Sequence, residues 1–250
     1  MATQSVEFAN VSFALADGRE ILHDISLRIE AGTTTALLGR SGSGKTTLLR
    51  TVNALVRPAS GRVRIGENDV GAAEVIPLRR SIGYVIQENG LFPHMTVARN
   101  VGLPLVLSGE QNAETIACKV EHVLSMVGLS YAELGSRYPW QLSGGQRQRV
   151  GVARALVTGP KVLLMDEPFG ALDPLTRAEM QTMLRDLLKQ VGVTTLIVTH
   201  DLEEALYLAD RVVLMDGGRI VANLAAGEVH SSPIDAVRRY VAATRRSDAA

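Results

Sequence analysis

The chain has 250 residues, of which 46% are apolar and 21% are charged, a globular composition that excludes an intrinsically disordered protein. Lys plus Arg and Asp plus Glu number 26 each, so the net charge gives no electrostatic reason to expect a nucleic-acid partner. The only cysteine, Cys118, cannot form an internal disulfide, which fits a reducing compartment.

Membrane-spanning and targeting segments are not expected. The first ten residues lack a basic stretch followed by an apolar one, so they do not predict a signal peptide. The apolar run Val101–Leu107 is far too short to span a bilayer and contains Gly102 and Pro104. If the protein serves a membrane, we expect it to dock onto another chain that spans it.

The N-terminal third alternates short apolar runs with turn signals. Thr34–Leu38 stops at a glycine loop, and such a compact run is typical of a strand buried on both faces of a parallel sheet. We expect a loop at Ala16–Arg19 and a helix that begins at Gly44. The predicted strands of this part are Val6–Leu15, Asp24–Ile29, Thr34–Leu38, Gly61–Ile65 and Ile82–Ile86.

A phosphate-binding pattern lies between the predicted strand at 34–38 and the following helix. Its glycines let the backbone N–H groups surround a phosphate, and the helix start adds the positive end of its dipole. We expect Lys45 to reach the outer phosphates and the Thr46 hydroxyl to bind Mg²⁺. The alternative, a chance glycine-rich turn, is disfavoured by the flanking strand and helix. The predicted ATP-binding residues of this loop are Gly39, Arg40, Ser41, Gly42, Ser43, Gly44, Lys45, Thr46 and Thr47.

The segment from about 88 to 142 has a different character and is predicted to be mostly helical. Its apolar residues recur at three- and four-residue steps, as on one face of a helix. These positions are Ile116, Val120, Val123, Leu124 and Val127.

A second glycine-containing segment, Leu142–Gln146, reads LSGGQ and precedes another predicted helix. Ser-Gly-Gly before a helix is a possible anion-binding helix start. A plain helix cap with a flexible lead-in explains the same residues equally well.

The apolar run Val162–Met165 ends in two carboxylates, Asp166 and Glu167. A buried strand here delivers both at its C-terminal end, where open α/β sheets bind ligands. Asp166 is placed to hold Mg²⁺, and Glu167 to orient or deprotonate a water that attacks the γ-phosphate. By itself the pattern also fits a helix cap. The glycine loop earlier in the chain favours catalysis.

The C-terminal part returns to the alternating pattern. We expect a helix after Pro174, a strand at Thr195–Val198, and a hairpin that turns at Gly217–Gly218 between arms at 212–215 and 219–222. A short helix from Ser232 is expected to fray into the last six residues. The predicted fold class is therefore α/β, with a mostly parallel sheet, an antiparallel β subdomain and a helical insertion.

Three segments together carry a family resemblance. GRSGSGKT at 39–46, LSGGQ at 142–146 and VLLMDE at 162–167 occur in the order found in ATP-binding cassette ATPases, which the whole chain resembles. The resemblance implies a P-loop NTPase core, ATP hydrolysis and Mg²⁺ as cofactor. It also implies one domain over 1–250, in which 1–87 and 143–230 form a RecA-like core with its antiparallel β lobe. Residues 88–142 then form the helical subdomain, and 231–250 a C-terminal helix and tail.

The resemblance also implies that a second copy of the chain, or a paralogous subunit, completes the site. In this family LSGGQ closes over ATP held by the phosphate loop of the partner. The residues that would contact the partner's nucleotide are Ser143, Gly144, Gly145 and Gln146.

Three further positions fall where the family places functional residues. Gln87 resembles the glutamine that touches Mg²⁺, beside Thr46 and Asp166, and senses the membrane partner. His200 resembles the switch histidine that contacts the γ-phosphate and joins Glu167 as a catalytic residue. The segment Ala171-Leu172-Asp173 resembles the loop that crosses the dimer interface, and Asp173 is its candidate interface residue. The alternatives are an exposed loop glutamine, a structural histidine and a helix cap before Pro174.

The sequence departs from the family pattern at the adenine. Family members often place an aromatic residue in the first strand to stack on the base, and Leu15 occupies that position here. Phe13, two residues earlier, faces the same side of a strand and is the predicted substitute.

Segment 78–107 resembles importer ATPases, most closely those of the glycine betaine, choline and osmoprotectant uptake group. The resemblance implies separate transmembrane permease chains, a solute-binding protein as an indirect partner, and a peripheral location on the cytoplasmic face of the inner membrane. Leu91-Phe92-Pro93 beside Gln87 is an apolar turn suited to docking a short permease helix. Packing of this turn onto its own helical insert is the alternative.

Other functions stay open. The same motifs fit an importer of another small solute such as an amino acid, an exporter, or a non-transport cassette ATPase. A nucleotide-binding regulator without hydrolysis is disfavoured by the presence of both Glu167 and His200. Because the chain ends soon after its last predicted helix, we expect no C-terminal nucleotide-sensing domains of the kind some osmoprotectant importers carry.

Overall fold

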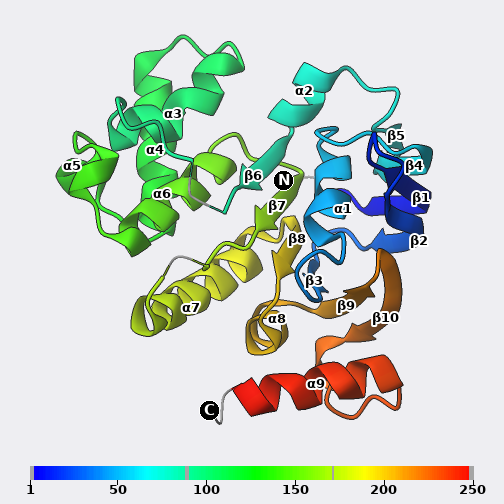
Figure 1. Ribbon diagram of the computed structural model, residues 1–250. Helices are drawn as coiled ribbons and strands as arrows, with labels where there is room; N and C mark the ends of the chain where they lie inside the picture. The colour runs from blue at the N-terminus through cyan, green and yellow to red at the C-terminus, as the bar shows by residue number, and fades with distance from the viewer. Residues whose placement is uncertain (1–2, 88–89, 171, 248–250) are drawn as a thin grey trace.

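The computed structural model of the protein describes residues 3–87, 90–170 and 172–247, and within them the chain forms two β-sheets with helices around them (Figure 1). Met1, Ala2, Glu88, Asn89, Ala171 and residues 248–250 lie outside the described residues. The expected α/β class, with a mostly parallel sheet, a separate antiparallel sheet and a helical insertion, is confirmed.

The larger sheet has six strands in the order β10-β9-β3-β8-β7-β6. All neighbouring pairs are parallel except β9 with β10, which form the expected C-terminal hairpin. Its strands are β3 (Thr34–Leu38), β6 (Ile82–Val85), β7 (Val162–Asp166), β8 (Thr194–Thr199), β9 (Arg211–Asp216) and β10 (Arg219–Ala225).

Strand β7 lies inside the sheet between β8 and β6, and its surroundings explain why its sequence is a continuous apolar run. Successive side chains point to opposite faces of a sheet, and both faces here are covered. Val162 and Leu164 join the cluster under α1 (Lys45–Val52). Leu163 and Met165 join the cluster formed with α6 (Gly144–Leu156) and α7 (Pro174–Val191). The strand therefore delivers its terminal carboxylate from a core fixed on two sides.

The smaller sheet is antiparallel, in the order β2-β1-β4-β5. Strand β2 begins at Glu20, four residues before the predicted start at Asp24. Polar residues at this end hide its alternation, but pairing of Phe13 with Leu22 and of Ala14 with Glu20 extends the ladder. The strands are β1 (Val6–Ala14), β2 (Glu20–Ile29), β4 (Ser60–Ile65) and the short β5 (Asn68–Asp69), which the sequence did not predict.

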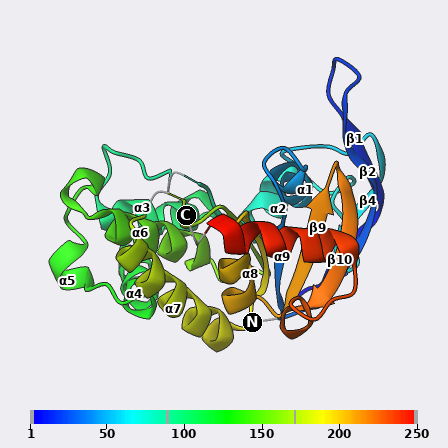
Figure 2. The ribbon, with the colours of Figure 1, turned by 60° about the horizontal axis from the view of Figure 1, so that its bottom comes forward.

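The helices between β6 and β7 lie together on one side of the molecule, away from the antiparallel sheet (Figures 1 and 2). The predicted stripe forms α4, where Val120, Val123 and Leu124 are buried. The apolar run at 101–107 lies in α3, with Pro104 inside the helix. These helices are α3 (Val97–Leu107), α4 (Ala113–Met126), α5 (Tyr131–Leu134) and α6.

Two short helices were not predicted, α2 (Val75–Arg80) and α8 (Leu202–Leu208). Each is too short to show a helical period in sequence. The last helix, α9 (Asp235–Ser247), extends farther than the expected fraying point and crosses the end of the molecule beside α8 and β10 (Figure 2). None of the helices in the described part of the chain combines the length and apolar character that crossing a membrane requires.

Leu164 tests how much the double-sided core contributes. It is fully buried in β7, so Leu164→Ala should lower the free energy of unfolding by about 2–5 kcal/mol through lost burial and a residual cavity. Leu175→Ala is the control, because that side chain is 72% exposed and its loss should cost less than about 0.5 kcal/mol. Urea unfolding curves measure both. Equal midpoints for the two variants would contradict this packing.

Candidate functional site

The glycine loop at 39–44 connects β3 to α1 and is braced from behind by neighbouring backbone. A Cβ on Gly39 would collide with the carbonyl oxygen of Met215 in β9. Gly44 has φ of 95°, and a Cβ there would lie 2.9 Å from the carbonyl oxygen of Ile21. Only glycine tolerates both constraints, so the tight loop is dictated by its surroundings as well as by any ligand.

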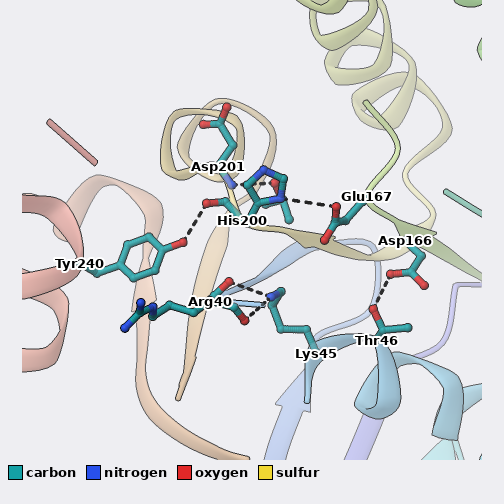
Figure 3. Close-up of polar contacts among 10 residues, drawn as sticks. Arg40, Lys45, Thr46, Asp166, Glu167, His200, Asp201 and Tyr240 are labelled. Carbon is teal, nitrogen blue, oxygen red and sulfur yellow. Dashed lines mark hydrogen bonds and ion pairs between the residues drawn. The ribbon is translucent and has the colours of Figure 1, made fainter. Parts of the chain in front are cut away.

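Lys45 closes this loop from inside (Figure 3). Its Nζ donates to the carbonyl oxygens of Gly39 at 2.7 Å and Arg40 at 2.9 Å. Burial lowers the pKa of Lys45, and the charges of Glu167 and Asp166 oppose that shift. The Lys45 ammonium thus lies close to the N-terminus of α1. The two positive charges together suit the binding of an anion.

Thr46 and Asp166 meet although they lie 120 residues apart. The Thr46 hydroxyl donates to Oδ1 of the buried Asp166 at 2.7 Å, while Arg50 lies 3.5 Å from Oδ2. Hydroxyl and carboxylate oxygens are the ligands that Mg²⁺ prefers, and it uses few protein ligands when phosphates supply others. The pair therefore fits one such ion, even though no group of three or more His, Cys, Asp or Glu gathers within the described residues.

Glu167 and His200 face one another at the ends of β7 and β8 (Figure 3). The His200 Nδ1 lies 3.4 Å from Oε2 of Glu167. Glu167 has φ of 45°, a conformation that costs a non-glycine residue energy and is concentrated at functional sites. Its amide donates to the Val198 carbonyl at 3.0 Å, which ties the turn to the neighbouring strand. Parallel pairing of β7 with β8 thus brings the two side chains together.

The LSGGQ segment begins α6, and here it forms a reciprocal cap. Ser143 Oγ accepts from the Gln146 amide at 3.2 Å, and Gln146 Oε1 accepts from the Ser143 amide at 3.0 Å. Gly145 has no room for a side chain, since a Cβ would lie 2.7 Å from Cγ2 of Thr176. No hydrogen bond or ion pair that the structure describes joins Ser143, Gly144, Gly145 or Gln146 to the glycine loop of the same chain.

The remaining predicted site residues, Asp173, Gln87 and Phe13, lie at three separate places in the fold. Asp173 caps α7 by accepting from the Thr176 amide at 3.0 Å, and hydrogen bonds from the Thr176 side chain and then from its amide lower the pKa of Asp173. Gln87 is exposed in the turn after β6. Phe13 packs partly into the core cluster of the antiparallel sheet, while Leu15 is 37% exposed. The predicted role of Phe13 at adenine stays a prediction, and Ala171 lies outside the described residues.

Sequence reasoning missed several polar residues around this site. Arg50 lies one helical turn after Thr46 on α1, and this i, i+4 spacing in the sequence places both side chains on the same face of the helix. Tyr84 shares a hydrogen bond with Arg50, and its pKa is raised, chiefly by burial. No sequence pattern marks Glu204 or Tyr240, because each is brought to the site by contacts with residues far away in the chain.

Glu204 is the most perturbed carboxyl group beside the site. It lines a small cavity with Glu167, Arg177 and His200, and its Oε1 has no hydrogen-bond partner among the described residues. Burial raises its pKa to about 7, the nearby charge of Asp201 adds to the shift, and hydrogen bonds and Arg177 oppose it.

Comparison with known proteins gives a consistent group. Residues 22–170 match the ABC transporter family. The chain is 42% identical over 229 residues to the carnitine transport ATP-binding protein OpuCA of Listeria monocytogenes, covering 91% of this chain and 57% of that protein. It is 45% identical over 216 residues to the glycine betaine uptake system ATP-binding protein YehX of Escherichia coli, covering 86% and 69%.

The similarity extends to other solutes. The chain is 49% identical over 215 residues to the sulfate/thiosulfate import ATP-binding protein CysA of Mesorhizobium japonicum, covering 85% of this chain and 61% of that protein. The chain therefore spans less than two thirds of the length of OpuCA and CysA.

Two solved structures share the fold. One is cbiO1 of Clostridium perfringens, part of the ABC transporter complex cbiONQ, with a TM-score of 0.83 and 31% identity over 91% of this chain and 90% of that one. The other is a dimeric post-hydrolysis state of an ATP-binding cassette bound to ADP and Pi. Its TM-score is 0.78 at 32% identity, over 88% and 98% of the two chains.

The pKa of Glu204 predicts a pH dependence of stability. The folded protein keeps this proton up to about pH 7, whereas the unfolded chain releases it near 4.5, so folded-state stability falls as pH rises through this interval. Between pH 5 and 8, wild type should lose about 1–3 kcal/mol more unfolding free energy than Glu204→Gln, which cannot titrate. Chemical denaturation at each pH measures the difference. Parallel pH profiles for the two proteins would show that Glu204 titrates normally.

Proposed function

The chain belongs to the ABC transporter family, and on that premise we propose that it is the ATP-hydrolysing subunit of a solute importer. The observation that carries the proposal is the convergence of three features at one edge of the parallel sheet. These are the loop closed by Lys45, the Thr46–Asp166 contact and the Glu167–His200 pair. A loop suited to phosphate, a pair of oxygens suited to a cation and a candidate base lie side by side.

ATP binding is assigned to the loop from Gly39 to Thr47. Its backbone N–H groups and the start of α1 favour the β- and γ-phosphates, and Lys45 adds a positive charge. The Lys45 ammonium donates hydrogen bonds to the carbonyl oxygens of Gly39 and Arg40. Phosphate oxygens would compete with these two carbonyl oxygens for the same ammonium. Phe13 is proposed to contact the adenine.

Mg²⁺ is the cofactor we propose, held by Thr46, Asp166 and Gln87. When bound, the ion neutralises charge on the β- and γ-phosphates. The short Thr46–Asp166 hydrogen bond supports the first two ligands, because it places two oxygens together at the edge of the loop. Gln87 is exposed and follows strand β6, the neighbour of β7 in the sheet.

Glu167 is proposed as the residue that orients and deprotonates the attacking water, and His200 as its partner at the γ-phosphate. The 3.4 Å separation of His200 Nδ1 and Glu167 Oε2 leaves the histidine able to fix the carboxylate. The backbone strain at Glu167 supports a functional demand on its position. A positioned base of this kind contributes about 10²–10⁴-fold to a rate.

A second copy of the chain is the proposed partner at the nucleotide. Ser143, Gly144, Gly145 and Gln146 present a helix N-terminus that makes no described contact with the loop of its own chain. Such a helix N-terminus is suited to bind the phosphates of an ATP held by another subunit. The dimeric neighbour bound to ADP and Pi supports this arrangement. Asp173, which begins α7, is proposed to lie at the same interface.

Permease docking is proposed in a cavity of about 510 Å³ between α2, β6 and α3. Its rim carries exposed apolar side chains, Ile76 at 64%, Phe92 at 41% and Leu107 at 57% exposure. Phe92 belongs to the turn predicted from sequence, and its backbone is anchored by the buried Asn100. A groove that is largely apolar suits a short helix of a transmembrane chain.

The proposed solute is a quaternary amine such as glycine betaine, choline or carnitine. The likeness to OpuCA and YehX supports this class. A small solute of another kind, such as sulfate, is the second candidate, because CysA is similarly close. In both cases we propose a solute-binding protein as an indirect partner and a peripheral position on the cytoplasmic face of the inner membrane. No nucleic-acid partner is proposed, given equal numbers of acidic and basic residues.

Glu167→Gln tests the catalytic assignment. Loss of the base should lower kcat at least about 100-fold while ATP binding persists, and ATP should then trap a stable dimer. The control is Glu203→Gln, the same change at an exposed position on α8. Phosphate release gives the rate, binding of a fluorescent ATP analogue gives the affinity, and light scattering gives the mass. Full hydrolysis by Glu167→Gln would remove Glu167 from the mechanism.

Ile76→Asp and Leu107→Asp test the docking cavity. Each places a charge on an apolar rim position, so a permease should no longer co-purify with the tagged chain from native membranes, while ATPase activity of the isolated chain stays the same. Leu55→Asp is the control, since Leu55 is 50% exposed outside the cavity. Recovery of the wild-type chain only with ribosomes, with DNA or without partners would overturn the transport proposal.

A further inference from the structure

The main chain at His200 is held by a hydroxyl from the C-terminal helix. Tyr240, on α9, donates from its hydroxyl to the carbonyl oxygen of His200 at 2.8 Å (Figure 3). The two residues are 40 positions apart. His200 itself lies in the short connection between β8 and α8, where its ring faces Glu167.

The rest of this connection is fixed by other contacts. Thr199 Oγ1 accepts from the Asp201 amide at 3.0 Å, and Asp201 Oδ1 accepts from the Glu204 amide at 3.1 Å, which caps α8. These hydrogen bonds hold the residues on either side of His200. The hydrogen bond that the structure describes to the His200 carbonyl comes from Tyr240.

Tyr240 reaches this carbonyl because α9 is docked by an apolar face. Val237 and Val241 are buried in a cluster with Leu202 of α8 and with strands β9 and β10. Burial raises the pKa of Tyr240 to about 12, with a smaller contribution from the charge of Asp201. The hydroxyl therefore stays a hydrogen-bond donor throughout the physiological pH range.

A cavity of about 630 Å³ lies beside Tyr240, between α9 and strands β9 and β10, and is lined by Arg40, Tyr240 and Thr244, among others. The Tyr240 hydroxyl itself is directed at the main chain of the residue whose ring meets the proposed base (Figure 3).

We propose that Tyr240 is a positioning residue for hydrolysis, whose hydroxyl fixes the His200 main chain and thereby the placement of its imidazole against Glu167. This inference rests on the proposed ATPase function. It makes α9 a part of the hydrolytic apparatus that touches no reacting atom. A displacement of α9 is transmitted through this hydrogen bond to His200.

Tyr240→Phe removes the hydroxyl and keeps the ring, so packing of α9 is preserved. Loss of one hydrogen bond that acts on the transition state should lower kcat about 3- to 10-fold, with the KM for ATP unchanged. Tyr207→Phe is the matched control, because it removes a tyrosine hydroxyl that lies 3.1 Å from Thr182 Oγ1 on the neighbouring helices. It should leave kcat at the wild-type value.

Combination with His200→Ala separates positioning from a general structural effect. If Tyr240 acts through His200, adding Tyr240→Phe to His200→Ala should cause no further fall in kcat. A wild-type kcat for Tyr240→Phe, or the same fall in both backgrounds, would overturn the inference while leaving the proposed function intact. Absence of ATP hydrolysis by the wild-type chain would instead overturn the proposed function.

A spectroscopic readout tests the inference without turnover. The imidazole ¹H–¹³C signals of His200 are assigned by their loss in His200→Ala among the 5 histidines of the chain. Tyr240→Phe should shift these signals and Tyr207→Phe should not, because only the first change releases the His200 main chain. Unshifted His200 signals in Tyr240→Phe would contradict the inference whatever the ATPase activity.

Discussion

The site depends on one interaction, the hydrogen bond between Thr46 and Asp166, which joins the end of the glycine loop to the end of β7. It exists because β8 lies between β3 and β7 in one parallel sheet, so the carboxyl ends of all three strands meet at the same edge. Residues that follow each strand are thereby brought together from distant parts of the chain. The buried, two-sided core of β7 fixes the position of this edge, and the Glu167–His200 contact is its second product.

The sequence predicted what is encoded locally. The apolar run at 162–165, the glycine loop and the stripe that forms α4 are each legible because one period or one motif contains the whole signal. The start of β2 at Glu20 was missed because it depends on cross-strand pairing. Glu204 and Tyr240 were missed because burial and a contact 40 residues away create their roles. A single sequence carries no pattern for either.

One chain contains complementary halves of the proposed hydrolytic site on separate surfaces. The loop around Lys45 and the capped start of α6 at Ser143 have no described contact with one another, although each is suited to phosphate. The cavity proposed for permease docking lies on a further surface, between α2, β6 and α3. The Glu167–His200 pair and the Tyr240 contact of α9 both lie at the carboxyl edge of the parallel sheet. Chains similar to this one belong to proteins named for different solutes, carnitine for OpuCA and sulfate/thiosulfate for CysA.

The most direct test of this account is ATP hydrolysis by a mixture of two inactive variants. Glu167→Gln keeps an intact LSGGQ segment, and Ser143→Arg keeps an intact loop, Glu167 and His200. In a shared site, one of the two nucleotide sites of a mixed dimer is complete. The account predicts that each variant alone is nearly inactive and that mixing restores a substantial part of wild-type hydrolysis. A mixture as inactive as its components, under conditions in which mixed dimers form, would contradict a site built from two copies of the chain.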